Sequence, residues 1–176
     1  MRLFIALPMP DKVKDRLVEL QQPINGVRWQ DKQKLHLTLK FLGDTEPEKV
    51  RTLQDQLQQV NQESFSIILT GFGYFPEGKK PSVLWTGIEQ SDPLTSLYQK
   101  IEQVCTSLGF EENTRPFKPH VTIARINGGQ KRDVMSFINQ HKQFRMENVP
   151  VDEFVLYESK LDPEGAKHIR LRTFLL

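Results

Sequence analysis

Two short phrases in the chain each place a histidine two residues before a threonine within an apolar run. The first is HLTL, with His36 and Thr38, and the second is HVTI, with His120 and Thr122. Because side chains alternate between the two faces of an extended strand, each histidine would share a face with its threonine while the apolar neighbours point to a core. We therefore expect two similar strands that each present an imidazole and a hydroxyl group.

A pair of histidines can supply one neutral imidazole that accepts a proton and one imidazolium that donates a proton. That combination suits in-line displacement at phosphorus, such as the opening of a cyclic phosphate, where water attacks on one side and the leaving oxygen needs a proton on the other. Thr38 and Thr122 would donate hydrogen bonds to the phosphate oxygens. One HxT phrase alone is ordinary in a strand. Two copies in a chain of 176 residues favour one shared site, with His36 and His120 as its catalytic residues.

No cluster of carboxylates accompanies these histidines in the sequence, and two imidazoles without a third ligand make a poor zinc or magnesium site. We therefore expect chemistry without a metal or another cofactor. Arg125, five residues after His120, could bind phosphate as a bidentate donor. Strict alternation places Arg125 on the face opposite His120, so it reaches the site only if the strand bulges or ends first. Its alternative role is a structural salt bridge.

Other side chains near the two phrases are weaker candidates for contact with a substrate. Basic residues that could extend a positive rim for a nucleic-acid backbone are Lys32, Lys34, Lys40, Arg115 and Lys118. Aromatic residues that could stack on a base, or instead belong to the core, are Trp29, Phe41, Phe72, Tyr74 and Trp85. Neither His141 nor His168 repeats, and we interpret both as structural. Cys105 is interpreted as an inert helix residue.

The elements that must position these residues follow from hydrophobic periodicity and turn signals. Strands are expected at 2–8, 27–29, 35–43, 65–76, 82–89, 119–126, 151–161 and 168–176, and helices at 11–22, 47–60, 93–108 and 131–141. A turn, DPEG at 162–165, separates the last two strands. Because hairpins and crossovers are mixed, we expect an α+β fold, a bilobal pseudo-two-fold arrangement of two largely antiparallel sheets with outer helices and a central cleft. Residues 1–176 would form a single two-lobed domain.

Composition indicates a globular protein with one core. Hydrophobic residues make up 38% and charged residues 26% of the chain, and no stretch approaches the ~20 apolar residues of a membrane span. The apolar stretch at the N-terminus is too short for a signal peptide, so we expect a cytoplasmic monomer with no membrane partner. A net charge of +2 permits an anionic substrate without requiring one.

The order and spacing of these segments resemble the two-histidine phosphoesterases, and within them the RNA 2′,3′-cyclic phosphodiesterases once described as 2′-5′ RNA ligases. The resemblance runs nearly end to end, through RLFIALP, LHLTLKFLGD, GFGYFP with VLWTGI, RPFKPHVTIAR and LYESKLDPEGAKHIRLRTFLL. It implies hydrolysis of a 2′,3′-cyclic phosphate at an RNA end to a 2′-phosphomonoester. By this likeness His36 donates the proton to the leaving 3′ oxygen and His120 is the base. Thr38, Thr122 and Arg125 would hold the phosphate.

Two other functions stay open on the sequence alone, besides a minor reverse reaction that would join a cyclic phosphate end to a 5′ hydroxyl. The first is a phosphodiesterase of the same superfamily that acts on another 2′-5′ or cyclic nucleotide phosphoester. The second is a module that binds RNA or nucleotides without turnover. The two phrases describe phosphate chemistry and do not separate the substrates. The presence of both histidines and both threonines argues against a loss of turnover.

Overall fold

The computed structural model describes residues 1–163 and 165–176 of the chain. Its strands are β1 (Arg2–Pro8), β2 (Val27–Trp29), β3 (His36–Asp44), β4 (Phe65–Glu77), β5 (Lys80–Ile88), β6 (His120–Ile126), β7 (Arg145–Val151), β8 (Glu153–Asp162) and β9 (Gly165–Leu175). Its α-helices are α1 (Asp11–Glu19), α2 (Pro47–Leu57), α3 (Asp92–Ser107) and α4 (Lys131–Gln140), and a short 3₁₀ turn, η1, spans Lys32–Lys34. The expected α+β class is confirmed.

The strands follow one hydrogen-bonded path in the order β7-β4-β5-β6-β3-β1-β8-β9, and β2 pairs with β6 beside it. Neighbouring strands in the described ranges are antiparallel throughout. The path divides into two halves of four strands, and the two HxT strands, β3 and β6, meet at its middle. The two expected sheets are therefore the two halves of one larger sheet.

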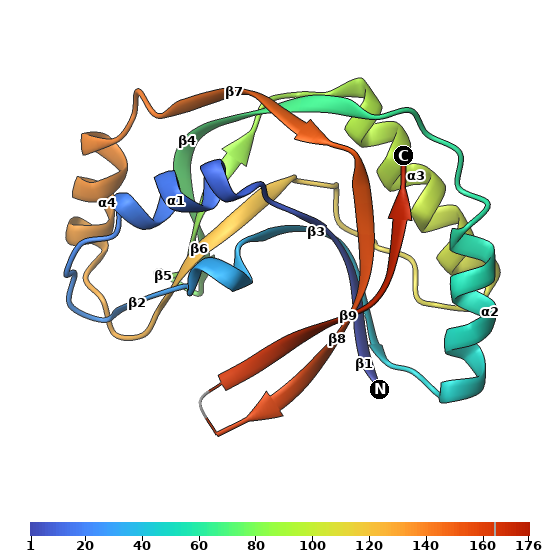
Figure 1. Cartoon of the computed structure of the whole chain (residues 1–176). Coiled ribbons are helices and arrows are strands. Elements are labelled where there is room, and N and C mark those ends of the chain that lie inside the picture. The colour runs from blue at the N-terminus through green and yellow to red at the C-terminus, as the bar shows by residue number, and fades with distance from the viewer. Residues whose placement is uncertain (164) are drawn as a thin grey trace.

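The helices lie outside the two halves of the sheet. Figure 1 shows α1 and α4 together at one side of the molecule and α2 and α3 at the other. Each helix turns an apolar stripe inward, and Leu53 of α2, Ile101 of α3 and Phe137 of α4 are at most 1% exposed. Cys105 on α3 is also buried, and burial raises the pKa of its thiol to about 12, so the thiolate does not form at neutral pH. It is the inert helix residue that the sequence predicts.

One strand, β7, is absent from the prediction. It lies at the end of the path and pairs with β4, and its sequence, RMENVPV, mixes charged and polar residues with Pro150. Proline suits an edge strand because it has no N–H to donate to a second neighbour. Asn148 has a positive φ of 54°, which interrupts the extended backbone. Only Val149 and Val151 of this strand are buried, which is too short a signal for period-two analysis.

Strands β8 and β9 form a long hairpin whose tip projects away from the sheet, below β2 and η1 in Figure 1. At the tip Asp162 pairs with Gly165. The predicted turn at 162–165 includes position 164, which lies outside the described residues. Within the described ranges, none of the helices is both long and apolar enough to span a membrane.

Candidate active site

The two HxT motifs come together because β3 and β6 are neighbours. One ladder pair, Leu37 with Val121, joins these strands, and both side chains are fully buried. Extending this antiparallel register by one residue in each direction places His36 opposite Thr122 and Thr38 opposite His120. In this extended register each histidine is across from the threonine of the other motif. A local pseudo-two-fold axis passes between the two buried residues.

A β-bulge in β6 brings Arg125 to the face of the histidine. Along the β5 pairing, Thr122 faces Trp85 and Ala124 faces Leu84, so that the residue between them, Ile123, has no partner on β5. Ile123 and Ala124 are consecutive buried residues, which breaks the alternation, and Arg125 is exposed. The bulge on which the prediction depended is therefore present, and Arg125 shares a face with His120 and Thr122.

A matching bulge occurs at the same distance along β3. Thr38 pairs with Ala6 and Lys40 pairs with Ile5, so that Leu39 has no partner on β1. Phe41, which corresponds to Arg125, consequently points outward and is 72% exposed. Lys40 points inward instead, is only 2% exposed, and forms an ion pair of 2.7 Å with Glu102. The prediction that Lys40 belongs to a positive rim is therefore wrong, because the bulge turns its side chain to the other face.

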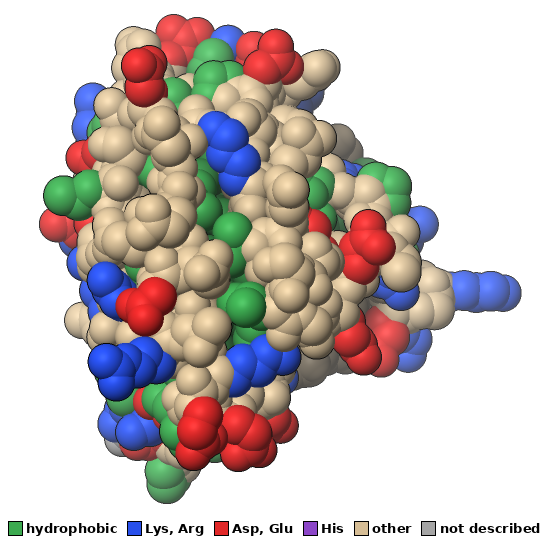
Figure 2. Space-filling model, turned by 90° about the vertical axis from the view of Figure 1, so that its right-hand side faces the viewer, with side chains coloured by type: hydrophobic (Ala, Val, Ile, Leu, Met, Phe, Trp, Pro, Cys, Tyr) green, Lys and Arg blue, Asp and Glu red, His purple; other side chains and the backbone are tan. Residues whose placement is uncertain are grey.

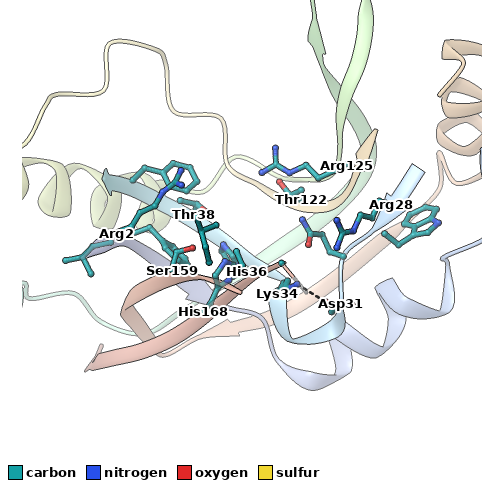
Figure 3. A pocket seen from close by; sticks show the side chains of 18 of the residues that line it. Arg2, Arg28, Asp31, Lys34, His36, Thr38, Thr122, Arg125, Ser159 and His168 are labelled. Atoms are coloured by element: carbon teal, nitrogen blue, oxygen red, sulfur yellow. Dashed lines mark ion pairs between the residues drawn. The ribbon is translucent and has the colours of Figure 1, made fainter. Parts of the chain in front are cut away.

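A cleft of about 480 Å³ lies over the junction of the two strands. All five predicted site residues line it, namely His36, Thr38, His120, Thr122 and Arg125. Figure 3 shows Thr122 and Arg125 on one wall of this cleft and His36 with Thr38 on the facing wall. The size is in the range of small-molecule sites, roughly 300–1,000 Å³. The arrangement places two imidazoles, two hydroxyls and one guanidinium around one space.

The imidazole of His120 is fixed by the backbone just before it. Its Nδ1 lies 2.7 Å from the carbonyl oxygen of Lys118. Since a carbonyl can only accept, Nδ1 carries the proton, and the neutral ring presents the lone pair of Nε2 as its remaining acceptor. Phe75 meets the ring edge-on at 4.8 Å between centroids. Burial lowers the pKa of His120, the carbonyl opposes this effect, and the positive charge of Lys118 adds to it.

The imidazole of His36 lies in a more enclosed and more aromatic place. The rings of Phe4, His168 and Tyr157 surround it at centroid distances of 5.1, 5.2 and 6.2 Å. Burial lowers the pKa of His36 to about 4, and the charge of His168 acts in the same direction. The backbone of Lys34, two residues before His36, opposes the shift by a hydrogen bond. Both histidines are thus held by the backbone of the second residue before them.

His168, which the sequence analysis interprets as structural, lines the cleft. Its ring meets that of His36 edge-on and also contacts Phe4 at 4.9 Å. Burial lowers the pKa of His168, and the charge of Lys34 adds to this effect. Its Nδ1 is buried without a hydrogen-bond partner among the residues that the structure describes. His141, by contrast, packs against Phe137 at 4.6 Å, away from the cleft, as expected for a structural residue.

The remaining basic candidates have separate roles. Lys34 lines the cleft and forms an ion pair of 2.9 Å with Asp31, drawn as a dashed line in Figure 3. Lys32 pairs with an aspartate of α1, and Lys118 lies over the Trp85 ring at 4.7 Å. Arg115 lies in a different groove, beside α3. Of the five predicted rim residues, Lys34 alone lines the cleft.

Most of the aromatic residues that were candidates for base stacking pack against the core instead, which is the second role that the sequence analysis gives them. Phe72 packs against Phe144 at 4.7 Å, and Tyr74 is partly buried against the main core. Trp29 lines the cleft, but its indole N–H is committed to the carbonyl of Gln22 at 2.7 Å. Phe41 lines the cleft with most of its side chain exposed, so it is the candidate with a free face.

Sequence reasoning missed several residues that line the cleft, chiefly Arg2, Phe4, Arg28, Asp31 and Ser159. They lie on β1, β2, β8 and the loop before η1, far from either motif in the sequence, and only the sheet order brings them together. A further repeat was visible in the sequence, since a lysine stands two residues before each histidine, in KLH and in KPH. That repeat marks the two carbonyl groups that hold the imidazoles.

The chain is similar to known proteins along nearly its whole length. The family model described as LigT like phosphoesterase matches residues 7–85 and 87–168. The chain is 33% identical over 171 residues to the RNA 2′,3′-cyclic phosphodiesterase of Thermotoga maritima, which covers 94% of this chain and 90% of the relative. It is also 33% identical over 188 residues to the protein of the same name from Thermus thermophilus, with 100% and 90% covered.

Solved structures share the fold over nearly the whole chain. The crystal structure of TT0787 of Thermus thermophilus has a TM-score of 0.80 at 29% identity and covers 100% of this chain and 98% of its own. The structure of Escherichia coli LigT complexed with 3′-AMP also has a TM-score of 0.80, at 24% identity, with 99% and 97% covered. The second likeness concerns the fold alone.

Proposed function

The chain belongs to the LigT like phosphoesterase family, and from this premise we propose that it is an RNA 2′,3′-cyclic phosphodiesterase. The proposed reaction converts a cyclic phosphate at an RNA end to a 2′-phosphomonoester and a free 3′ hydroxyl. One observation carries the proposal: the two HxT strands are neighbours in the sheet, and both histidines and both threonines line one cleft. The names of the curated relatives support the substrate class.

In the proposed reaction a water oxygen attacks phosphorus while the bond from phosphorus to O3′ breaks. His120 takes a proton from the water through Nε2, since its Nδ1–H is already bonded to the Lys118 carbonyl. His36 gives a proton to O3′ as that bond breaks. After one turnover His120 has gained a proton and His36 has lost one, so exchange with solvent restores both groups. Water is the one co-reactant consumed.

The phosphate oxygens need hydrogen-bond donors as charge develops on them. Thr38 and Thr122 line the cleft from the two strands, and each has a hydroxyl to donate. Arg125 supplies a planar guanidinium that can bind two phosphate oxygens at once. The bulge in β6 is therefore the structural reason that a third donor joins the two hydroxyls.

The acid role of His36 requires a proton that the unliganded protein does not hold at neutral pH. Burial lowers the pKa of this histidine to about 4, whereas a proton donor must be an imidazolium. A bound cyclic phosphate carries a negative charge, which favours the charged form of a nearby imidazole. We infer that bound substrate raises the pKa of His36, so that this imidazole takes up a proton from solvent when the substrate binds. The two histidines then titrate as a pair, which gives a bell-shaped dependence of rate on pH.

We also infer that residues 1–176 work as a single two-lobed domain and that a monomer suffices, because each half of the sheet contributes one HxT strand to the same cleft. The same groups would act on a 5′ hydroxyl in place of water. Attack by that hydroxyl, with O3′ again leaving, would form a 2′-5′ linkage without ATP. Hydrolysis dominates in this proposal because water is far more concentrated than any RNA end.

The deciding experiment incubates the protein with adenosine 2′,3′-cyclic phosphate in buffer that contains EDTA and separates the products by chromatography. We expect 2′-AMP to accumulate, and activity to fall at least about 100-fold in His36→Ala and His120→Ala, as for loss of a general acid or base. His141→Gln serves as the matched control, because this histidine lies outside the cleft. A 3′-AMP product, full activity in His36→Ala, or complete loss of activity with EDTA would contradict the proposal.

A further inference from the structure

Two arginines face each other across neighbouring strands beside the cleft. Arg28 of β2 stands directly opposite Arg125 of β6 in the ladder, and both line the cleft. Opposed residues on an antiparallel pair have Cβ atoms roughly 4.5–5.5 Å apart, and like charges in that position destabilise the sheet. Among the residues that the structure describes, neither arginine forms an ion pair. An anion in the cleft would relieve this repulsion.

A lysine converges with Arg28 beside the tip of the β8–β9 hairpin. A Cβ atom built on Gly165 would lie 3.6 Å from Nη2 of Arg28 and 3.7 Å from Nζ of Lys34. Both cationic atoms therefore border the same small space, which the missing side chain of Gly165 leaves open. Gly165 has φ of 117°, a conformation that favours glycine, so the backbone itself keeps a side chain out of this space.

The charge that lines the cleft exceeds what one cyclic phosphate needs. Four described lining residues are cationic, namely Arg2, Arg28, Lys34 and Arg125, and the acidic residue among the described lining is Asp31. Asp31 already pairs with Lys34. The side of the molecule shown in Figure 2 differs from the cleft, since acidic and basic side chains are interspersed on it. A cyclic phosphodiester carries a single negative charge, which Arg125 and one imidazolium can neutralise.

We propose that Arg28 and Lys34 form a second phosphate subsite, which binds the phosphate on the 5′ side of the nucleotide that carries the cyclic phosphate. This inference rests on the proposed function and narrows its substrate class. RNA ends that carry an upstream phosphate are preferred over nucleoside 2′,3′-cyclic phosphates that lack one. The opposed arginines place the two subsites side by side, as successive phosphates lie along a strand. Arg125 serves the reacting phosphate, and Arg28 serves its upstream neighbour.

The test compares adenosine 2′,3′-cyclic phosphate with the same compound phosphorylated at its 5′ oxygen, so that the added phosphate is the sole difference. For the unaltered protein we expect the 5′-phosphate to raise kcat/KM about tenfold, mainly through KM, since charge-assisted hydrogen bonds form in substrate and transition state alike. In Arg28→Ala the ratio of the two kcat/KM values should fall towards one. Arg28→Lys should keep part of the gain, and raised salt should reduce it in the unaltered protein.

Arg51→Ala is the matched control, because Arg51 is an exposed arginine of α2 that does not line the cleft. A ratio near one in the unaltered protein would overturn the subsite and leave the proposed function standing, as would an Arg28→Ala variant that keeps the ratio. Absence of turnover on both compounds would contradict the proposed function instead. Calorimetry then tests the subsite by comparing the affinities for adenosine 2′,5′-bisphosphate and 2′-AMP. About tenfold tighter binding of the bisphosphate, lost in Arg28→Ala, would support the subsite. Equal affinities for the two compounds would overturn the subsite.

Discussion

The two halves of the sheet share a motif, a register and a bulge, yet they place different side chains around the same cleft. Two residues after each threonine, Lys40 is buried on β3 where Ala124 is buried on β6. One residue further, β3 exposes Phe41 and β6 exposes Arg125. The backbone is therefore nearly symmetric, and the chemistry is not. The repeated strand geometry delivers three positions from each strand to the cleft, and the side chains at those six positions divide the work.

The two histidines occupy equivalent positions on their strands but have different neighbours. His36 is enclosed by three rings, and burial with the charge of His168 lowers its pKa to about 4. His120 contacts Phe75 and lies near Lys118, and burial lowers its pKa without a large shift. One imidazole is thus held more strongly in its neutral form than the other. This difference shows that identical motifs can be given distinct proton affinities by their neighbours.

The largest expected effect breaks the symmetry of the histidines directly. Both His36→Ala and His120→Ala should lower kcat about 1,000-fold on an ordinary cyclic phosphate. A cyclic analogue with sulfur in place of O3′ has a leaving group that needs no proton, because a thiol has a pKa near ~8.5. On this analogue His36→Ala should recover most of its lost rate, and His120→Ala should stay inactive. Stopped-flow or chromatographic rates on the two substrates measure the difference.

Rescue of His120→Ala instead would exchange the two roles, which the lower pKa of His36 in the unliganded protein would then explain. Rescue of neither variant would mean that the histidines bind phosphate without transferring protons. Circular dichroism of each variant serves as the folding control, since both alanines remove buried ring contacts.

The next effect concerns stability against pH. Because the folded pKa of His36 lies near 4 and its unfolded pKa near 6.5, the unfolded chain binds a proton between these values that the folded protein does not. The contribution of neutral His36 to the free energy of unfolding is therefore complete above pH 6.5 and is lost as the pH falls to about 4. It amounts to at most about 3 kcal/mol. Urea unfolding at a series of pH values should show this rise in the unaltered protein.

His36→Gln should flatten the rise more than His120→Gln does, because the pKa of His36 is lowered further. His168, whose pKa is also lowered by burial, adds its own part to the rise. Equal flattening by the two glutamine variants would show that the two rings have the same environment in solution.

The smallest effects separate the two residues that the bulges expose. Arg125→Ala should lower kcat about 100-fold, as for loss of a donor to a developing charge. Phe41→Ala should lower kcat/KM about tenfold, since base stacking on an aromatic ring is worth ~1–3 kcal/mol. The Phe41 effect should shrink when the terminal adenine is replaced by uracil. The measurement is the steady-state rate of each variant on both nucleotides, with Arg51→Ala as the control. An equal loss of kcat/KM in Phe41→Ala on the adenine and uracil substrates would show that Phe41 does not stack on the base.

Alternation in the sequence was enough to predict which faces the two histidines and threonines share, because no irregularity intervenes between them. It failed one residue later, since an unpartnered Leu39 or Ile123 leaves no mark in the sequence. For this reason alternation predicts the wrong face for Lys40 and places Arg125 in the site only on the condition of a bulge. The interpretation of His168 as structural has another cause. His168 enters the site from a strand far along the chain through the order of the sheet, which local periodicity does not contain.

The single ladder pair at the middle of the sheet also determines how accurately the two imidazoles are spaced. Between His36 and His120 the shortest route through the protein is one peptide unit, the pair of Leu37 with Val121, and one further peptide unit. Small displacements of the other strands therefore have little effect on the distance between the two imidazoles. If one half of the sheet tilted about this pair, its outer strands would move further than β3 and β6. Such a tilt would change the width of the outer cleft, where Phe41 is exposed, and leave the proton-transfer distances almost untouched.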